Sequence, residues 1–180
     1  MNLTRMSRTM SYLLRHEKGF FGQDGFVAVD KLIKRMQEQY PDFSTEILEE
    51  IVRTDPKGRY AFDGRKQHIR AVQGHSVPVD LSLEPAVPPD RLYHGTSVSV
   101  RSSIMCEGIT KQSRQYVHLS KDVPTATAVG MRHAHRRDRL MILQVDAGRM
   151  FRDGYLFFRA ENGVWLTDRV PPPYIRDMDD

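Results

Sequence analysis

Apolar residues recur at helical spacing in three stretches of the first half of the chain. The first stretch follows Thr4, which can cap a helix, and runs to about His16. Asp30 can cap the second helix and Ser44 the third, and the third pattern ends before Pro56. The expected buried positions are Met6, Met10, Leu13 and Leu14 in the first helix, Leu32, Ile33 and Met36 in the second, and Ile47, Leu48, Ile51 and Val52 in the third. The sequence therefore predicts three amphipathic helices.

A hairpin signal follows these helices. The strand-like runs RYAF and KQHIRA flank Asp63-Gly64, a residue pair that tolerates positive φ and favours a tight turn. Three helices followed by a two-stranded ribbon is the pattern of a winged-helix module, and such modules often bind nucleic acid. We therefore expect residues 1–85 to form a winged-helix lobe.

A proline-rich segment separates this lobe from the rest of the chain. Residues 77–91, VPVDLSLEPAVPPDR, contain four prolines. Pro88-Pro89 can neither continue a helix nor pair within a central strand. We interpret the segment as a linker that leads into a second lobe over residues 91–176.

The second lobe alternates short strands with helices. Strands are predicted at RLYHGT (91–96), YVHLS (116–120), RLMILQVDA (139–147) and GVWLTDRV (163–170), and helices over 98–107 and 123–137. The first strand is expected to end in a turn at Gly95-Thr96, and Trp165 is expected in the core. This mixture predicts the α+β class for the whole chain.

The amino-acid composition excludes several classes of protein. Lys plus Arg number 27 against 23 Asp plus Glu, a mildly basic balance that is compatible with nucleic acid. One cysteine, Cys106, excludes an internal disulfide and a thiolate metal cluster, which fits a reducing compartment. The chain has no secretory signal pattern and no 18-residue apolar window. We expect a cytoplasmic protein without membrane contact, and a monomer.

Arginine and histidine gather in four separated segments, LLRH (13–16), IRAVQGHS (69–76), LYHGT (92–96) and GMRHAHRR (130–137). Guanidinium groups bind phosphate in a bidentate way, and histidine can donate or accept a proton near neutral pH. The four segments could therefore converge on one anionic substrate. Simpler interpretations stay open. Arg15 and His16 can compensate a helix dipole, Arg70 can face solvent, and the run that starts at Arg132 can be a solvated helix face.

Two histidines occupy matching strand ends. His94 precedes Gly95-Thr96, and His118 precedes Ser120 at the end of another strand. Imidazole and hydroxyl groups can bond ribose hydroxyls, so a shared pocket is one interpretation and two structural histidines the other. The spacing of the histidines does not match HExxH, so no metal site is predicted. The sequence also contains neither a GxGxxG motif nor a P-loop, so neither of these nucleotide-binding motifs is indicated.

Six strings in order, LLRH, IRAVQGHS, LYHGT, YVHLS, VGMRH and ENGVWLT, resemble the tRNA 2′-phosphotransferase family of NAD-dependent RNA 2′-phosphotransferases. The resemblance runs from about Thr4 to Tyr174. It implies an N-terminal winged-helix lobe that holds RNA and a C-terminal ADP-ribosyltransferase-like lobe that binds NAD. It also implies a catalytic quartet of Arg15, His16, Arg70 and Arg132, and NAD contacts from His94, Gly95, Thr96, His118, Ser120 and Val164.

The resemblance implies a two-step reaction. An internal RNA 2′-phosphate is transferred to NAD through an ADP-ribosylated RNA phosphate, with release of nicotinamide and ADP-ribose 1″,2″-cyclic phosphate. Protein-modifying ADP-ribosyltransferases carry glutamate where this chain has Val164, and Glu161 is offset, which favours a phosphate acceptor. Two alternatives remain: a mono-ADP-ribosyltransferase that acts on nucleic-acid phosphate or protein and stops after the first step, and a winged-helix DNA-binding regulator.

Overall fold

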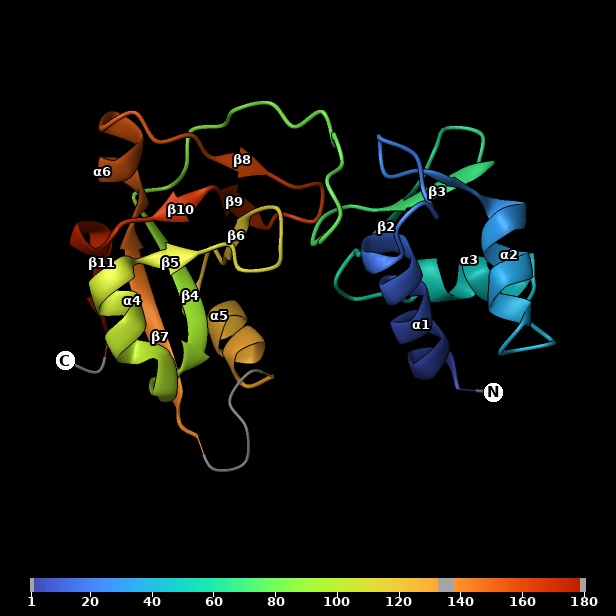
Figure 1. Cartoon of the computed structure of the whole chain (residues 1–180), viewed down its shortest axis with the longest axis horizontal. Coiled ribbons are helices and arrows are strands. Elements are labelled where there is room, and N and C mark those ends of the chain that lie inside the picture. Colours follow the sequence, from blue (N-terminus) through green and yellow to red (C-terminus); the bar gives the residue numbers. More distant parts are fainter. Residues whose placement is uncertain (1, 133–137, 179–180) are drawn as a thin grey trace. The chain divides into compact units, whose positions relative to one another are not determined.

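The computed structural model describes residues 2–132 and 138–178, and within them the chain is a mixed α/β protein with small sheets (Figure 1). It divides into two compact units, unit 1 (Met1–Ser82) and unit 2 (Leu83–Asp180). The proline-rich segment is attached to both: Asp80 N donates to Gln23 O (2.7 Å) and Ala86 N donates to Phe157 O (2.8 Å). In the described residues, no helix has both the length and the apolar character needed to cross a bilayer.

Unit 1 packs three helices on a small antiparallel sheet with strand order β1-β3-β2. Its elements are α1 (Leu3–His16), β1 (Val27–Ala28), α2 (Val29–Gln37), α3 (Thr45–Arg53), β2 (Tyr60–Phe62) and β3 (His68–Ala71). The predicted apolar stripes form the core, although Ile33, Ile47 and Val52 are only partly buried. The three predicted helices are confirmed.

Only one of the three predicted helix caps is confirmed. The Ser44 side chain accepts from Ile47 N at the start of α3 (3.5 Å). The cap at Thr4 is wrong, since Asn2 Oδ1 accepts from Arg5 N (3.0 Å) and α1 begins earlier. The cap at Asp30 is also wrong. Val29 N donates to Gln67 O (2.9 Å), so pairing with the sheet, and not a side chain, sets the start of α2.

The predicted hairpin is confirmed but its turn is wrong. Strands β2 and β3 pair antiparallel, with Phe62 opposite Ile69, so the loop is longer than two residues. The positive φ falls on Lys66 (55°) and not on Gly64. Asp63 Oδ1 accepts from the backbone N–H groups of Gln67 (2.8 Å) and His68 (3.2 Å). This carboxylate organises the loop in the way that an Asx side chain does.

Unit 2 contains three small antiparallel sheets, β11-β7-β4, β6-β9-β8 and β10-β5. Its elements are β4 (Arg91–Ser97), η1 (Val98–Val100), α4 (Arg101–Glu107), β5 (Ile109–Thr110), β6 (Val117–Leu119), α5 (Val123–Gly130), β7 (Leu140–Asp146), α6 (Ala147–Arg152), β8 (Phe158–Arg159), β9 (Trp165–Thr167), β10 (Arg169–Val170), η2 (Pro172–Tyr174) and β11 (Ile175–Asp177). The long β4–β7 pair lies at its centre (Figure 1). Trp165 is 7% exposed, which confirms its core position.

Two predictions for unit 2 are wrong. Strand β4 does not turn at Gly95-Thr96 but continues to Ser97, because every one of its residues pairs with β7. Helix α5 ends at Gly130, not at residue 137; Met131 and Arg132 form a turn, and residues 133–137 of the predicted helix lie outside the described residues. The α+β mixture itself is borne out.

Candidate functional site

Three predicted site residues of unit 1 meet where the end of α1 is bonded to the segment after β3. Ser76 N donates to Arg15 O (3.1 Å), and the Ser76 hydroxyl bonds His16 Nδ1 (2.8 Å). Arg15, His16 and Arg70 all act electrostatically on one buried side chain, His75. We call these four residues the basic cluster: Arg15, His16, Arg70 and His75. The structure thus brings together three of the four residues predicted to be catalytic.

Arg70 is held by an aromatic ring. It lies on β3 opposite Ala61 and is half-buried. Its Cζ lies 4.7 Å from the centroid of the Phe26 ring, a cation–π distance. The ring therefore limits the orientations of the guanidinium. Sequence reasoning did not single out Phe26.

His75 is the site residue that sequence reasoning missed. It is only 1% exposed, and its ring meets the Phe21 ring edge-on at 5.6 Å. Burial, together with the charges of Arg15, His16 and Arg70, lowers its pKa to about 4, and a backbone hydrogen bond with Leu14 opposes this shift with a smaller effect. The imidazole is therefore neutral at pH 7. The only signal in the sequence was Gly74, whose φ of 92° turns the chain as His75 enters the interior.

The predicted histidine pair of unit 2, His94 and His118, lies on adjacent chain segments. Tyr93 and Ser120 exchange two backbone hydrogen bonds of 2.8 Å, and His94 Nδ1 lies 3.1 Å from His118 O. Because a carbonyl oxygen only accepts, Nδ1 of His94 carries the proton. In the neutral ring, Nε2 of His94 is then the acceptor.

Gly95 serves a purpose that differs from the predicted turn. A Cβ added there would lie 1.9 Å from Ala126 O of α5. At Gly130, the last residue of α5, an added Cβ would lie 2.9 Å from the carbonyl carbon of Gly95. The two glycines let α5 and β4 pack backbone against backbone, and Thr96 follows in the paired strand.

Val164 immediately precedes β9, the strand that pairs with the strand of His118. Its carbonyl accepts from Ala160 N (2.9 Å), just before β9 begins. Strand β9 pairs with β6, where His118 is opposite Leu166. The predicted dinucleotide contacts of unit 2 thus come from β4, β6 and the start of β9.

The fourth predicted catalytic residue, Arg132, lies in unit 2 in the turn after α5, and it is exposed. Arg114 is exposed as well, and partial desolvation together with the charge of Arg132 lowers its pKa. Arg114 precedes β6 and is a second cation that sequence reasoning missed; its place two residues before YVHLS was the available signal.

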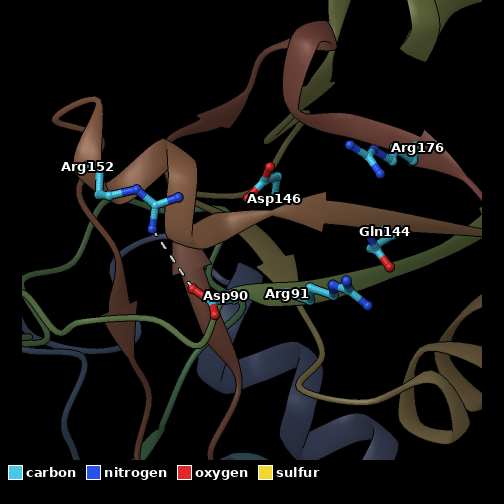
Figure 2. A pocket seen from close by; sticks show the side chains of 6 residues that line it. All are labelled: Asp90, Arg91, Gln144, Asp146, Arg152 and Arg176. Atoms are coloured by element: carbon cyan, nitrogen blue, oxygen red, sulfur yellow. Dashed lines mark ion pairs between the residues drawn. The ribbon is translucent and has the colours of Figure 1, made fainter.

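A hollow in unit 2 contains none of the predicted site residues. Figure 2 shows the residues that line it: Asp90, Arg91, Gln144, Asp146, Arg152 and Arg176. Arg152 faces Asp90 at 4.0 Å, and Asp146 adds a second carboxylate. The carboxylates of Asp90 and Asp146 offset two of the three arginine charges that line the hollow. Among the described residues, no group of three His, Cys, Asp or Glu side chains could hold a metal ion.

Comparison with known proteins gives one consistent match. A family model described as "RNA 2′-phosphotransferase, Tpt1 / KptA family" matches residues 1–169. The chain is 44% identical over 180 residues to a probable RNA 2′-phosphotransferase of Nostoc punctiforme, which covers 98% of this chain and 97% of the relative. It is 45% identical over 181 residues to one of Burkholderia lata (98% and 91%) and 46% identical over 176 residues to one of Rhizobium leguminosarum bv. trifolii (96% and 92%).

Proposed function

The chain belongs to the RNA 2′-phosphotransferase family, as its sequence motifs predicted, and we propose that it removes an internal 2′-phosphate from RNA by transferring it to NAD. The proposed products are RNA with a free 2′-hydroxyl, nicotinamide and ADP-ribose 1″,2″-cyclic phosphate. In this proposal unit 1 is a winged-helix lobe that holds RNA, and unit 2 is an ADP-ribosyltransferase-like lobe that binds NAD.

The basic cluster is the observation that supports this proposal most. Arg15, His16 and Arg70 come from the ends of two elements and gather around His75. Planar guanidinium forks match the geometry of phosphate oxygens better than ammonium groups do. Such a cluster, in a family named for transfer of an RNA 2′-phosphate, fits recognition of that phosphate. By resemblance, Arg132 is proposed as the fourth member of the quartet.

The predicted dinucleotide-binding residues of unit 2 have groups that can bond a ribose. With Nδ1 of His94 committed to a carbonyl, Nε2 can accept from a ribose hydroxyl. We assign Thr96, His118 and Ser120 further contacts to the dinucleotide, and Val164 an apolar contact. Gly95 supports these contacts by allowing α5 to pack closely on β4.

The first step is positioning chemistry. A phosphate dianion is already a nucleophile, so the protein needs to align it rather than to deprotonate it. NAD supplies the reactive ribose carbon and the nicotinamide leaving group. The arginines of the basic cluster orient the 2′-phosphate, and His94 and His118 orient the ribose.

The second step is phosphoryl transfer, in which a ribose hydroxyl replaces the RNA oxygen on phosphorus. Arg15, Arg70 and Arg132 are assigned to stabilise the charge that spreads over the phosphate oxygens. His16 is assigned the proton transfer. Its Nδ1 is engaged by Ser76, so transfer to or from the substrate would use Nε2.

The test is to mix the purified protein with NAD and an oligoribonucleotide that carries one internal 2′-phosphate. We expect loss of the phosphate with stoichiometric release of nicotinamide, and no release with the matched 2′-hydroxyl oligonucleotide. A stable ADP-ribosylated product without cyclic phosphate would favour a mono-ADP-ribosyltransferase instead. Sequence-specific binding of duplex DNA without consumption of NAD would favour a regulator.

A further inference from the structure

His75 lies at the centre of the basic cluster, although the proposed reaction assigns it no role. Its neighbour Ser76 is bonded to both Arg15 and His16, so the end of α1 closes over it. Gly25 also lies against the ring, since an added Cβ there would lie 3.4 Å from Nε2 of His75 and 3.9 Å from Cβ of Arg70. Gly25 has a φ of 79°, so the backbone itself is shaped to this contact.

The charged groups that act on His75 are all basic. Arg15, His16 and Arg70 each oppose its protonation, and burial opposes it more strongly still. Neither ring nitrogen forms a hydrogen bond of good geometry within the described residues, and the backbone of Leu14 offers the ring only a weak polar contact. A buried polar side chain without such a bond has a cost, which indicates a purpose beyond packing.

A phosphate site built from arginines faces a conflict. The guanidinium groups must be held in place before the ligand arrives, and carboxylates are the usual partners that hold them. A carboxylate, however, also cancels the charge that attracts the phosphate. A buried, uncharged ring such as His75, which is 1% exposed, can fill the interior beside such groups without adding a negative charge.

We propose that His75 is a positioning residue, a neutral buried imidazole that holds Arg15, His16 and Arg70 in the arrangement that binds the RNA 2′-phosphate without cancelling their positive charge. This inference rests on the proposed function and extends it to a residue outside the predicted quartet. It predicts that a negative charge at position 75 abolishes phosphate recognition, whereas a neutral polar side chain preserves it.

The experiment compares His75→Asp and His75→Gln with wild-type protein. The control, Gln39→Asp, makes the same change of charge at an exposed position of unit 1. Binding is measured for a labelled oligoribonucleotide with one internal 2′-phosphate and for its 2′-hydroxyl twin, at one salt concentration. We expect His75→Asp to reduce the preference for the phosphate at least about tenfold, His75→Gln to keep it within about threefold, and Gln39→Asp to leave it unchanged.

Two results would overturn the proposal: a folded His75→Asp that keeps the preference, or a His75→Gln that loses as much as His75→Asp. Circular dichroism establishes folding. If His75→Asp does not fold, NMR titration of the His75 ring in wild-type protein decides: a ring that stays neutral from pH 8 to about 5 supports the proposal, and a ring protonated at pH 7 refutes it. Wild-type protein without any phosphate preference would contradict the proposed function instead, and the titration would then judge His75 alone.

Discussion

The basic cluster of unit 1 and the histidine pair of unit 2 are built in different ways. In unit 1, side chains position side chains: Phe26 holds Arg70, Ser76 holds His16, and His75 fills the centre. In unit 2, backbone groups position the side chains: strand pairing aligns Tyr93 with Ser120, and a carbonyl orients His94. The first arrangement should be sensitive to charge and pH, and the second to side-chain volume.

The largest effect is expected at Gly95 of unit 2. Gly95→Ala places a methyl group 1.9 Å from the backbone oxygen of Ala126, which no side-chain rotation can relieve. We expect a loss of at least about 3 kcal/mol in the free energy of unfolding, because overpacking against backbone forces α5 away from β4. Urea denaturation measures it. Gly64→Ala is the control, since an added Cβ there meets nothing within 4 Å, and equal stability of both variants would contradict backbone packing.

The matching test of unit 1 is its response to acid. Burial and three basic neighbours lower the pKa of His75 from 6.5 to about 4, so the unfolded chain binds this proton more readily than the folded one. Stability should therefore fall as the pH drops from about 6.5 towards 4, by about 3 kcal/mol from this residue. His75→Gln removes the effect. The measurement is urea denaturation of both proteins at pH 7 and pH 4.5; parallel losses in the two would show that His75 is not the cause.

A smaller effect is expected on turnover, and it distinguishes the planar guanidinium geometry of Arg70 from its positive charge. Arg70→Lys keeps the charge but loses the planar pair of donors, so we expect kcat/KM for 2′-phosphorylated RNA to fall about a hundredfold. Arg53→Lys on the exposed end of α3 is the matched control and should change nothing measurable. Near-wild-type turnover of Arg70→Lys would remove Arg70 from phosphate binding.

The elements of unit 1 were largely predictable because its helices carry strong apolar stripes. Met6, Met10, Leu13 and Leu14 mark one face of α1 without help from the rest of the fold. The start of α2 was not predictable, because it depends on a bond from Val29 to Gln67, which lies far along the chain. The same limit applies to His75 and Phe26, whose importance comes from neighbours brought together only by folding.

Gly95 shows why a motif can be recognised and its physical reason mistaken. A turn, a ligand and a closely packed helix all require the same residue at that position. The sequence therefore indicated that Gly95 is important but not why. Only the pairing of β4 with β7 shows that the strand continues through this glycine. The apolar run Leu140–Leu143 was the available clue, since the long buried strand that it predicts needs a partner of similar length.

The smallest expected effect concerns Phe26, and it tests whether side chains really set the geometry of the basic cluster. Phe26→Leu keeps an apolar side chain but removes the ring face 4.7 Å from Arg70 Cζ. A cation–π contact at a partly exposed site is worth about 1 kcal/mol, so binding of the 2′-phosphorylated oligonucleotide should weaken about fivefold. Phe62→Leu, on β2, is the control. A fivefold loss that appears equally with the 2′-hydroxyl oligonucleotide would mean that Phe26 serves general RNA binding, and the contrast between side-chain and backbone positioning would then hold for His16 and His75 but not for Arg70.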